Sequence, residues 1–375
     1  MEVDWSDQTR RDRIRAYVVQ PTNLDVTRYE LGGVLASESS LSGTYYGSTR
    51  CSGKLTMLSG DWRGWDRNGF VRIVHEVEGT SYSRELGTFI VGDDQASWEG
   101  GSAKVGLTLQ SALYALKSDV LPHSLVVRRG ASWTQAIRQL LDAVHRPCVV
   151  SATDRRCGAD TVYETGKGRL DSLMAMCSAG GYRADVDGHG RVTIHDYRMP
   201  VARTRTFSLD MTSPSGVVHD GASFSTNWLG RPSLVVANQK WSDQVNGKTV
   251  ESELIGTARV GAGADNHPSR RGYEVARYVS IQDDKAHRTY AFVNQQAKAT
   301  LDSDQWEDAE FEVTTQYLPV WEGDVGTITL PAGASYGGYS GTVAVVVKSA
   351  DLDLGKMQLK MTLKVVNARD TEGDD

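Results

Sequence analysis

The chain has 375 residues, a formal net charge of −6 and a hydrophobic fraction of 39%. Its length predicts about two to four domains, and no apolar run reaches the roughly 18 residues that a membrane span needs. Acidic and basic residues are well mixed, which argues against a general polyanion-binding surface. The N-terminus is charged where a signal peptide would be apolar, so we expect a protein that is made and folded in the cytoplasm.

Residues 1–118 consist of short apolar runs separated by glycine-containing turns, which predicts a β domain. The expected strands cover residues 14–19, 53–57, 71–77, 84–91 and 104–109. A short helix over residues 111–117 would plug one end of the resulting sandwich or barrel. Four basic residues lead into the first strand, and a solvated strand face is favoured for them over a phosphate site. They are Arg10, Arg11, Arg13 and Arg15.

Residues 119–200 change to helical patterns and predict a small α+β domain. Ser132 and Gln135 form a capping box before a helix that Pro147 stops. A second helix is expected from Thr165 to the Gly180-Gly181 pair. A hairpin follows, with strands over 182–186 and 192–194.

The remainder predicts a second β domain over residues 201–240 and 305–369, interrupted at 241–304 by an insert with one helix over 286–301. Strands are expected at 233–237 and 310–317, and residues 370–375 are expected to be frayed. From Met357 to Val365 every second residue is apolar, which predicts a strand with one buried and one wet face. The wet face would carry Gln358, Lys360, Thr362 and Lys364.

No catalytic, cofactor-binding or metal-binding set emerges from the sequence. The string Asp185-x-Asp187-x-His189-Gly190-x5-Asp196 has the spacing of a calcium loop, but strands flank it and its last ligand is aspartate. An Asp-Gly hairpin turn is therefore favoured. The four cysteines lack metal-binding spacing, and a Cys148–Cys157 bridge is compatible with the spacing but unneeded in a reducing compartment. The other two are Cys51 and Cys177.

Three other patterns are also better explained by structure. His75-Glu76 has no second histidine four residues on, so the zinc-protease motif is absent. Backbone N–H groups of the Gly166-Lys167-Gly168 turn could hold an anion, but the spacing of a phosphate loop is missing and a plain loop is favoured. Three tryptophans could form a platform that stacks on carbohydrate, or they could pack within the first β domain, and packing is favoured. They are Trp62, Trp65 and Trp98.

The order of a β domain, an α+β domain and an interrupted β domain resembles the tail hub proteins of long-tailed bacteriophages, similar in plan to the baseplate hub of contractile tails. The similarity is carried by several stretches, taken in sequence order. They are Tyr46 with Arg50-Cys51-Ser52-Gly53-Lys54-Leu55, then Glu85-Leu86-Gly87-Thr88-Phe89-Ile90-Val91, then Ser132 to Leu141 and Leu170-Asp171-Ser172-Leu173 with Gly181-Tyr182, Ala184 and Gly188, then Ala297 with Leu301 and Leu318-Pro319 with Gly323-Asp324-Val325, and finally Leu352 with Leu354 and Met357 with Leu359 and Met361.

This resemblance implies an α+β, mostly β fold with two tail-tube-like β-barrel or sandwich domains and smaller α+β domains between them. It implies a homotrimeric structural protein at the virion tail tip, which adapts a six-fold tail tube to a three-fold tip. The implied partners are a distal tail protein, the tail tube or tape measure, and a fibre or spike, with DNA only in transit and no membrane insertion. No cofactor and no enzymatic activity are expected. The alternative is a carbohydrate- or receptor-binding tail tip protein that uses the tryptophans.

Overall fold

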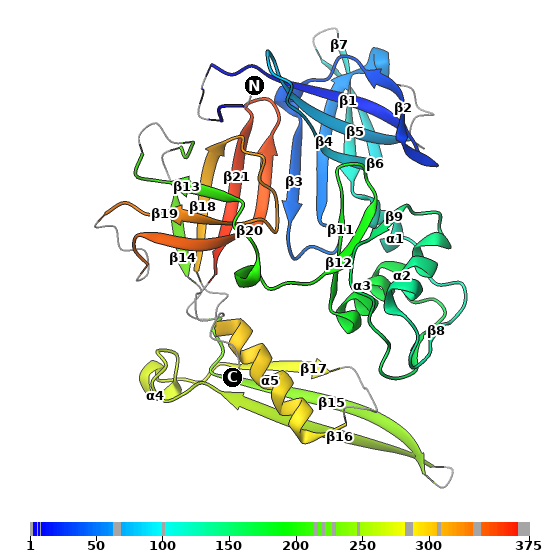
Figure 1. Ribbon diagram of the computed structural model, residues 1–375, viewed down its shortest axis with the longest axis vertical. Coiled ribbons are helices and arrows are strands. Elements are labelled where there is room, and N and C mark those ends of the chain that lie inside the picture. The colour runs from blue at the N-terminus through cyan, green and yellow to red at the C-terminus, as the bar shows by residue number, and fades with distance from the viewer. Residues whose placement is uncertain are drawn as a thin grey trace.

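The structure, a computed structural model, describes residues 3–5, 7, 9–62, 69–99, 102–213, 217–219, 222–226, 230–245, 248–281, 288–305, 309–332 and 339–366. Its main feature is a sheet of 13 strands to which both ends of the chain contribute. In Figure 1 this sheet fills the upper part of the molecule, and the strands from the N-terminal part of the chain lie beside those from the C-terminal part. The predicted α+β, mostly β class is confirmed.

In the described residues, the N-terminal half of the sheet contains seven strands. They are β1 (Asp12–Gln20), β2 (Asn23–Leu31), β3 (Ser40–Thr44), β4 (Cys51–Leu58), β5 (Phe70–Val77), β6 (Ser83–Glu99) and β7 (Ser102–Gln110). The sequence missed β2 and β3. β2 is the edge of the sheet and is exposed along most of its length, so it has no one-sided apolar pattern. β3 is only five residues long and is rich in serine and glycine.

The part of the C-terminal half that the structure describes contains six strands. They are β13 (Phe207–Asp210), β14 (Ser223–Thr226), β18 (Ala309–Gln316), β19 (Val325–Thr329), β20 (Thr342–Asp353) and β21 (Gln358–Val365). The alternation predicted for β21 is present, since Leu359, Met361 and Leu363 are fully buried. β18 and β20 pair with β21 on its two sides.

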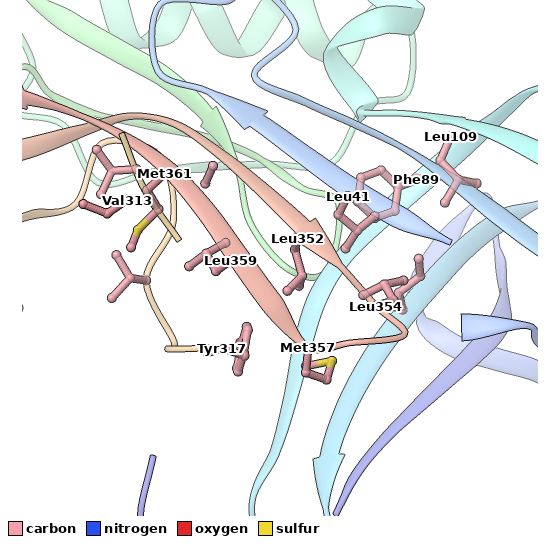
Figure 2. Packing of buried hydrophobic residues seen from close by; sticks show 14 of the residues in the cluster. Leu41, Phe89, Leu109, Val313, Tyr317, Leu352, Leu354, Met357, Leu359 and Met361 are labelled. Atoms are coloured by element: carbon pink, nitrogen blue, oxygen red, sulfur yellow. The ribbon is translucent and has the colours of Figure 1, made fainter. Parts of the chain in front are cut away.

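Strand β20 joins the two halves. Its residues 342–346 pair with β19, whereas its residues 349–353 pair with β3. The change of partner coincides with a register shift between Val347 and Ser349, where a bulge bends the strand. One hydrophobic core therefore runs through both halves. Figure 2 shows Leu41 of β3 beside Leu352 and Leu354 at this seam.

The middle of the chain forms the predicted helices and hairpin around a core of its own. Its elements are α1 (Ala112–Lys117), β8 (Leu125–Val127), α2 (Trp133–Asp142), β9 (Cys148–Val150), β10 (Thr161–Tyr163), α3 (Arg169–Gly180), β11 (Tyr182–Val186) and β12 (Val192–Asp196). Ser132 Oγ caps α2 by accepting a hydrogen bond from the Gln135 amide at 3.0 Å. α3 begins later than predicted because Gly166 has φ +83° and Gly168 is the extended cap residue.

The insert forms a separate three-stranded sheet under one long helix (Figure 1). Its elements are β15 (Leu234–Val245), β16 (Lys248–Arg259), α4 (Pro268–Arg271), β17 (Ala276–Ile281) and α5 (Tyr290–Gln305). The expected boundary at 240/241 falls inside β15, so the strand predicted at 233–237 belongs to the insert rather than to the large sheet. α5 starts at Tyr290, and residues 282–287 lie outside the described ranges.

Within the described ranges, short 3-10 turns also lie at Ala36–Glu38, Ser59–Asp61 and Pro200–Ala202. Among the described helices, none is long and apolar enough to cross a membrane. The expected frayed segment, residues 370–375, lies outside the described residues.

Candidate functional site: a polar sheet face and the junction beside it

One face of the large sheet is polar across the seam between the two halves. Residues that pair across antiparallel strands present their side chains on the same face, so the strand register can be read as rows. The middle row crosses six strands and consists of Thr314, Lys360, Asp351, Ser42, Ser52 and Gln110. The next row on one side consists of Glu312, Thr362, Ser349 and Thr44. The row on the other side consists of Gln316, Gln358, Asp353, Ser40, Lys54 and Thr108.

We call these three rows, with the flanking Glu310, Lys348 and Lys364, the polar face. All its members are serine, threonine, glutamine or charged residues. Its four carboxylates are matched by four lysines, so its formal charge is zero (4 − 4). Lys360 Nζ lies 3.3 Å from Glu312 Oε2, and Lys348 Nζ lies 2.5 Å from Glu310 Oε1. Such a surface offers hydrogen bonds but no net attraction to a polyanion.

At the rim of the polar face, Tyr45 links the two halves of the sheet to the α+β part. Its ring is buried, and the Arg183 guanidinium from β11 lies 3.8 Å from the ring centroid. The hydroxyl accepts a short hydrogen bond from Arg203, which also donates to the Gly323 carbonyl at 3.0 Å. Gly323 has φ +86°, and a Cβ there would lie 2.7 Å from the Tyr45 ring. Three parts of the chain therefore meet around one tyrosine.

Arg50, in the loop after β3, also contributes to these contacts around Tyr45, which we call the junction. Its guanidinium donates to the carbonyls of Tyr45 at 2.6 Å and Ala184 at 3.1 Å, and it lies 3.2 Å from Asp185. Asp185 also accepts a hydrogen bond from Arg183 at 2.7 Å. Burial, with the positive charge of Arg183, lowers the pKa of Arg50. These charges are paired and largely excluded from water, which suits a fixed joint.

Two cavities flank the junction, and Glu322 lines both of them. The larger, of about 520 Å³, lies between Tyr45, the β11–β12 hairpin and the loop before β19. The smaller, of about 160 Å³, lies between Cys51, the start of β6 and the turn after β11. Burial and the nearby Asp185 carboxylate raise the pKa of Glu322 to about 8. No sequence pattern marks this carboxyl group, because its burial arises only where distant segments meet.

Residues 185–196, which have the spacing of a calcium loop, form a hairpin that packs against the large sheet. Asp187 is occupied by Arg191, which donates to its two carboxylate oxygens from the amide at 2.8 Å and from Nε at 2.7 Å. The Gly188 carbonyl accepts a hydrogen bond from Thr88 of β6 at 2.7 Å, and a Cβ at Gly188 or Gly190 would lie 3.0 Å from β6 side chains. The glycines thus allow the hairpin to approach the large sheet. Within the described residues, no group of three or more His, Cys, Asp or Glu side chains could hold a metal ion.

The three tryptophans do not assemble into a platform in the part of the chain that the structure describes. Trp62 packs against the main core and donates to Asp94 at 3.2 Å, whereas Trp98 is 77% exposed on β6. Trp65 lies outside the described residues. The Gly166-Lys167-Gly168 turn is a loop before α3, with Lys167 stacked over Tyr163.

The basic residues near the N-terminus divide into two groups. Arg11 and Arg13 are exposed, and Arg15 forms ion pairs with Glu30 and Glu76 across neighbouring strands. Arg10, however, is buried against Trp5 and pairs with Asp12 at 2.9 Å. The solvated-face prediction is therefore wrong for Arg10, because Asp12 neutralises it inside the fold. Asp12 in turn lies 2.7 Å from Nε2 of the fully buried His75.

All four cysteines are free, including Cys148 and Cys157. Burial raises the pKa of the Cys177 thiol to about 12 and that of Cys51 further. These thiols are therefore protonated at neutral pH and behave as small apolar side chains.

Comparison of the sequence with protein-family models gives no match, and comparison with curated proteins gives none either. Solved structures do match along almost the whole chain. A tail protein from Neisseria meningitidis MC58 superposes with a TM-score of 0.64 at 13% identity, covering 94% of this chain and 96% of its own. The 43 kDa tail protein of prophage MuSo2 from Shewanella oneidensis gives 0.60 at 12% identity, covering 94% and 98%.

A third match connects the fold to hub proteins. An E. coli type VI secretion component, described as structurally similar to the T4 tail proteins gp27 and gp5, gives a TM-score of 0.50 at 10% identity, covering 96% of this chain and 78% of its own. The sequence-based resemblance to tail hub proteins is thus confirmed at the level of the fold. The chain has the fold of phage and prophage tail proteins over nearly its full length.

Proposed function

We propose that this protein is a structural hub at the distal end of a phage-type tail. In this proposal three copies form a ring, each contributing the two halves of its large sheet, so that a three-fold assembly presents six similar units to a six-fold tail tube. The observation that carries the proposal is the polar face, which passes without interruption from one half to the other through the β20–β3 pairing. This face would line the channel through which DNA passes.

The edges of the sheet support assembly into a ring. β2 ends the hydrogen-bonded strand path on one side and β14 ends it on the other. An open edge strand is a hazard for a free protein, and a closed ring of subunits covers such edges. The distal tail protein, the tail tube or tape measure and a fibre or spike are the partners proposed for the two ends of the ring, within an assembled virion.

The oligomeric state tests the proposal directly. Light scattering coupled to size exclusion should give about three times the 41.0 kDa chain mass, and negative-stain images should show rings with a central hole. A stable monomer at all concentrations would refute the trimer.

Two matched variants test which surface closes the ring. Val26→Asp places a charge on the β2 edge, where the side chain is 43% exposed, and should shift the trimer towards monomer. Val126→Asp places the same charge on β8, at 47% exposure and outside the large sheet, and should leave the trimer intact. Equal effects of the two substitutions would contradict a role for the β2 edge.

A further inference from the structure

The loop over residues 321–325 lies between β3 and the α+β part and contacts β3 and β20. The Gly323 amide donates to the Val347 carbonyl at 2.8 Å, and the Val347 amide donates to the Asp324 carbonyl at 2.9 Å. On its inner side the loop presses Trp321 and Glu322 against Gly43, where an added Cβ would lie 2.5 Å from Glu322 Oε2. The loop therefore fits only because β3 has a glycine at this position.

The Glu322 carboxyl is only partly compensated in this position, because a backbone hydrogen bond lowers its pKa by less than burial raises it. Its Oε2 is buried and has no hydrogen-bond partner among the described residues. The Arg183 and Arg50 guanidinium groups are engaged with Asp185, at 2.7 Å and 3.2 Å. A buried carboxylate that lacks a partner is strongly unfavourable, whereas a neutral carboxylic acid is tolerated.

We propose that protonation of Glu322 controls how tightly the 321–325 loop packs. While the Glu322 carboxyl is neutral, the loop packs tightly against β3 and the β11–β12 hairpin. Loss of its proton weakens this contact. The device belongs to the single chain and does not depend on ring assembly.

Other titratable groups face the same space and must be separated from Glu322. The larger cavity is lined by Tyr45, Arg183, Asp185, His195, Asp196, Arg198, Arg203 and Asp324, and Arg50 also interacts electrostatically with Glu322. The smaller one is lined by Cys51, Arg84, Glu85, Asp187 and Tyr317. Burial lowers the pKa of His195 and raises that of Asp324. Removing the charge of Glu322 alone therefore isolates its contribution from theirs.

The sign of the pH effect follows from linkage. The pKa of Glu322 is raised to about 8 in the closed junction, against an ordinary value of 4.5. The closed state therefore binds the proton more tightly than the open state, and opening becomes easier as the pH rises between these two values. Above pH 8 the carboxyl is ionised in both states, so the opening equilibrium no longer depends on its titration.

Hydrogen–deuterium exchange of the whole protein tests the proposal between pH 5.5 and 9. Exchange is corrected for intrinsic rates and compared with peptides from β4 and β5 in the main core. In the wild type, opening of peptides that contain residues 321–325 and 183–186 should increase at least tenfold from pH 6 to pH 8 and then level off. Glu322→Gln, which keeps the shape and removes the charge, should stay protected throughout.

Glu312→Gln is the matched control, because Glu312 lies on the exposed polar face beside Lys360 and should keep the wild-type pH profile. A wild-type junction with no pH dependence would overturn the proposal without requiring any variant to fold. A Glu322→Gln protein that opens over the same pH range as the wild type would overturn it as well.

Discussion

Replacing Tyr45 by phenylalanine should loosen the joint between the two sheet halves and the α+β part. The substitution removes only the hydroxyl, which accepts a hydrogen bond from Arg203 inside the junction. Because this acceptor serves a charged, half-buried donor, its loss should cost about 1.5–3 kcal/mol. The ring and its contact with Arg183, 3.8 Å from the ring centroid, stay in place.

Replacing Tyr45 by leucine should cost more than the phenylalanine substitution. Leucine removes the cation–π contact with Arg183 as well, which is worth about 2 kcal/mol at a desolvated site. Tyr46→Phe provides the control, since Tyr46 is 53% exposed and its hydroxyl accepts a long hydrogen bond of 3.4 Å from Lys364. An exposed contact of this kind should contribute less than about 0.5 kcal/mol.

Local opening is the quantity to measure, because a chain with several cores need not unfold in one step. At about 1.4 kcal/mol for each factor of ten, Tyr45→Phe should speed exchange of the amides in residues 183–186 and 321–325 roughly 10- to 100-fold at pH 6. Tyr46→Phe should leave these amides unchanged. If the two substitutions had equal effects, or if Tyr45→Phe accelerated exchange only in the insert, the role assigned to Tyr45 would be wrong.

Three further outcomes follow from single features of the fold. Gln239 is fully buried beneath α5, and both of its amide atoms lack partners among the described residues. Gln239→Met should therefore stabilise the insert by about 1–2 kcal/mol in thermal melts, and a loss of stability would contradict this. Glu310→Gln combined with Glu312→Gln should leave the polar face with excess lysine and create salt-sensitive binding to duplex DNA in fluorescence anisotropy, whereas the wild type should bind weakly at the same salt concentration. Gly326→Ala should destabilise the C-terminal half by about 1–3 kcal/mol in urea unfolding, because the new methyl would lie 2.6 Å from the Phe207 ring, and an unchanged midpoint would show that the ring can move.

Features that depend on neighbours in the sequence were predictable. The alternation over residues 357–365 identified β21 because one face of that strand is buried along its whole length. Ser132 identified the start of α2 because a serine that caps a helix bonds an amide only three residues away. Glycine spacing in the 185–196 string was correctly interpreted as a hairpin, although the reason for two of its glycines is the close approach of β6.

Features without a local pattern were missed. β2 has no buried face to create alternation, and β3 is too short and too rich in small polar residues to be distinguished from a loop. The start of the insert was misplaced because β15 is apolar enough to belong to either sheet, and only its pairing with β16 and β17 decides the matter.

By itself, the sequence determined that this is a mostly β protein with helices in its middle part, and its order of motifs pointed to the fold of tail hub proteins. Only the tertiary structure decided which residues of other strands continue the polar side of β21. Lys360 is joined through Asp351 to Ser42, a residue more than 300 positions earlier in the chain, and no local pattern can encode that pairing. The raised pKa of Glu322 has the same origin, because its carboxyl oxygen is buried only where separate segments of the chain pack around it.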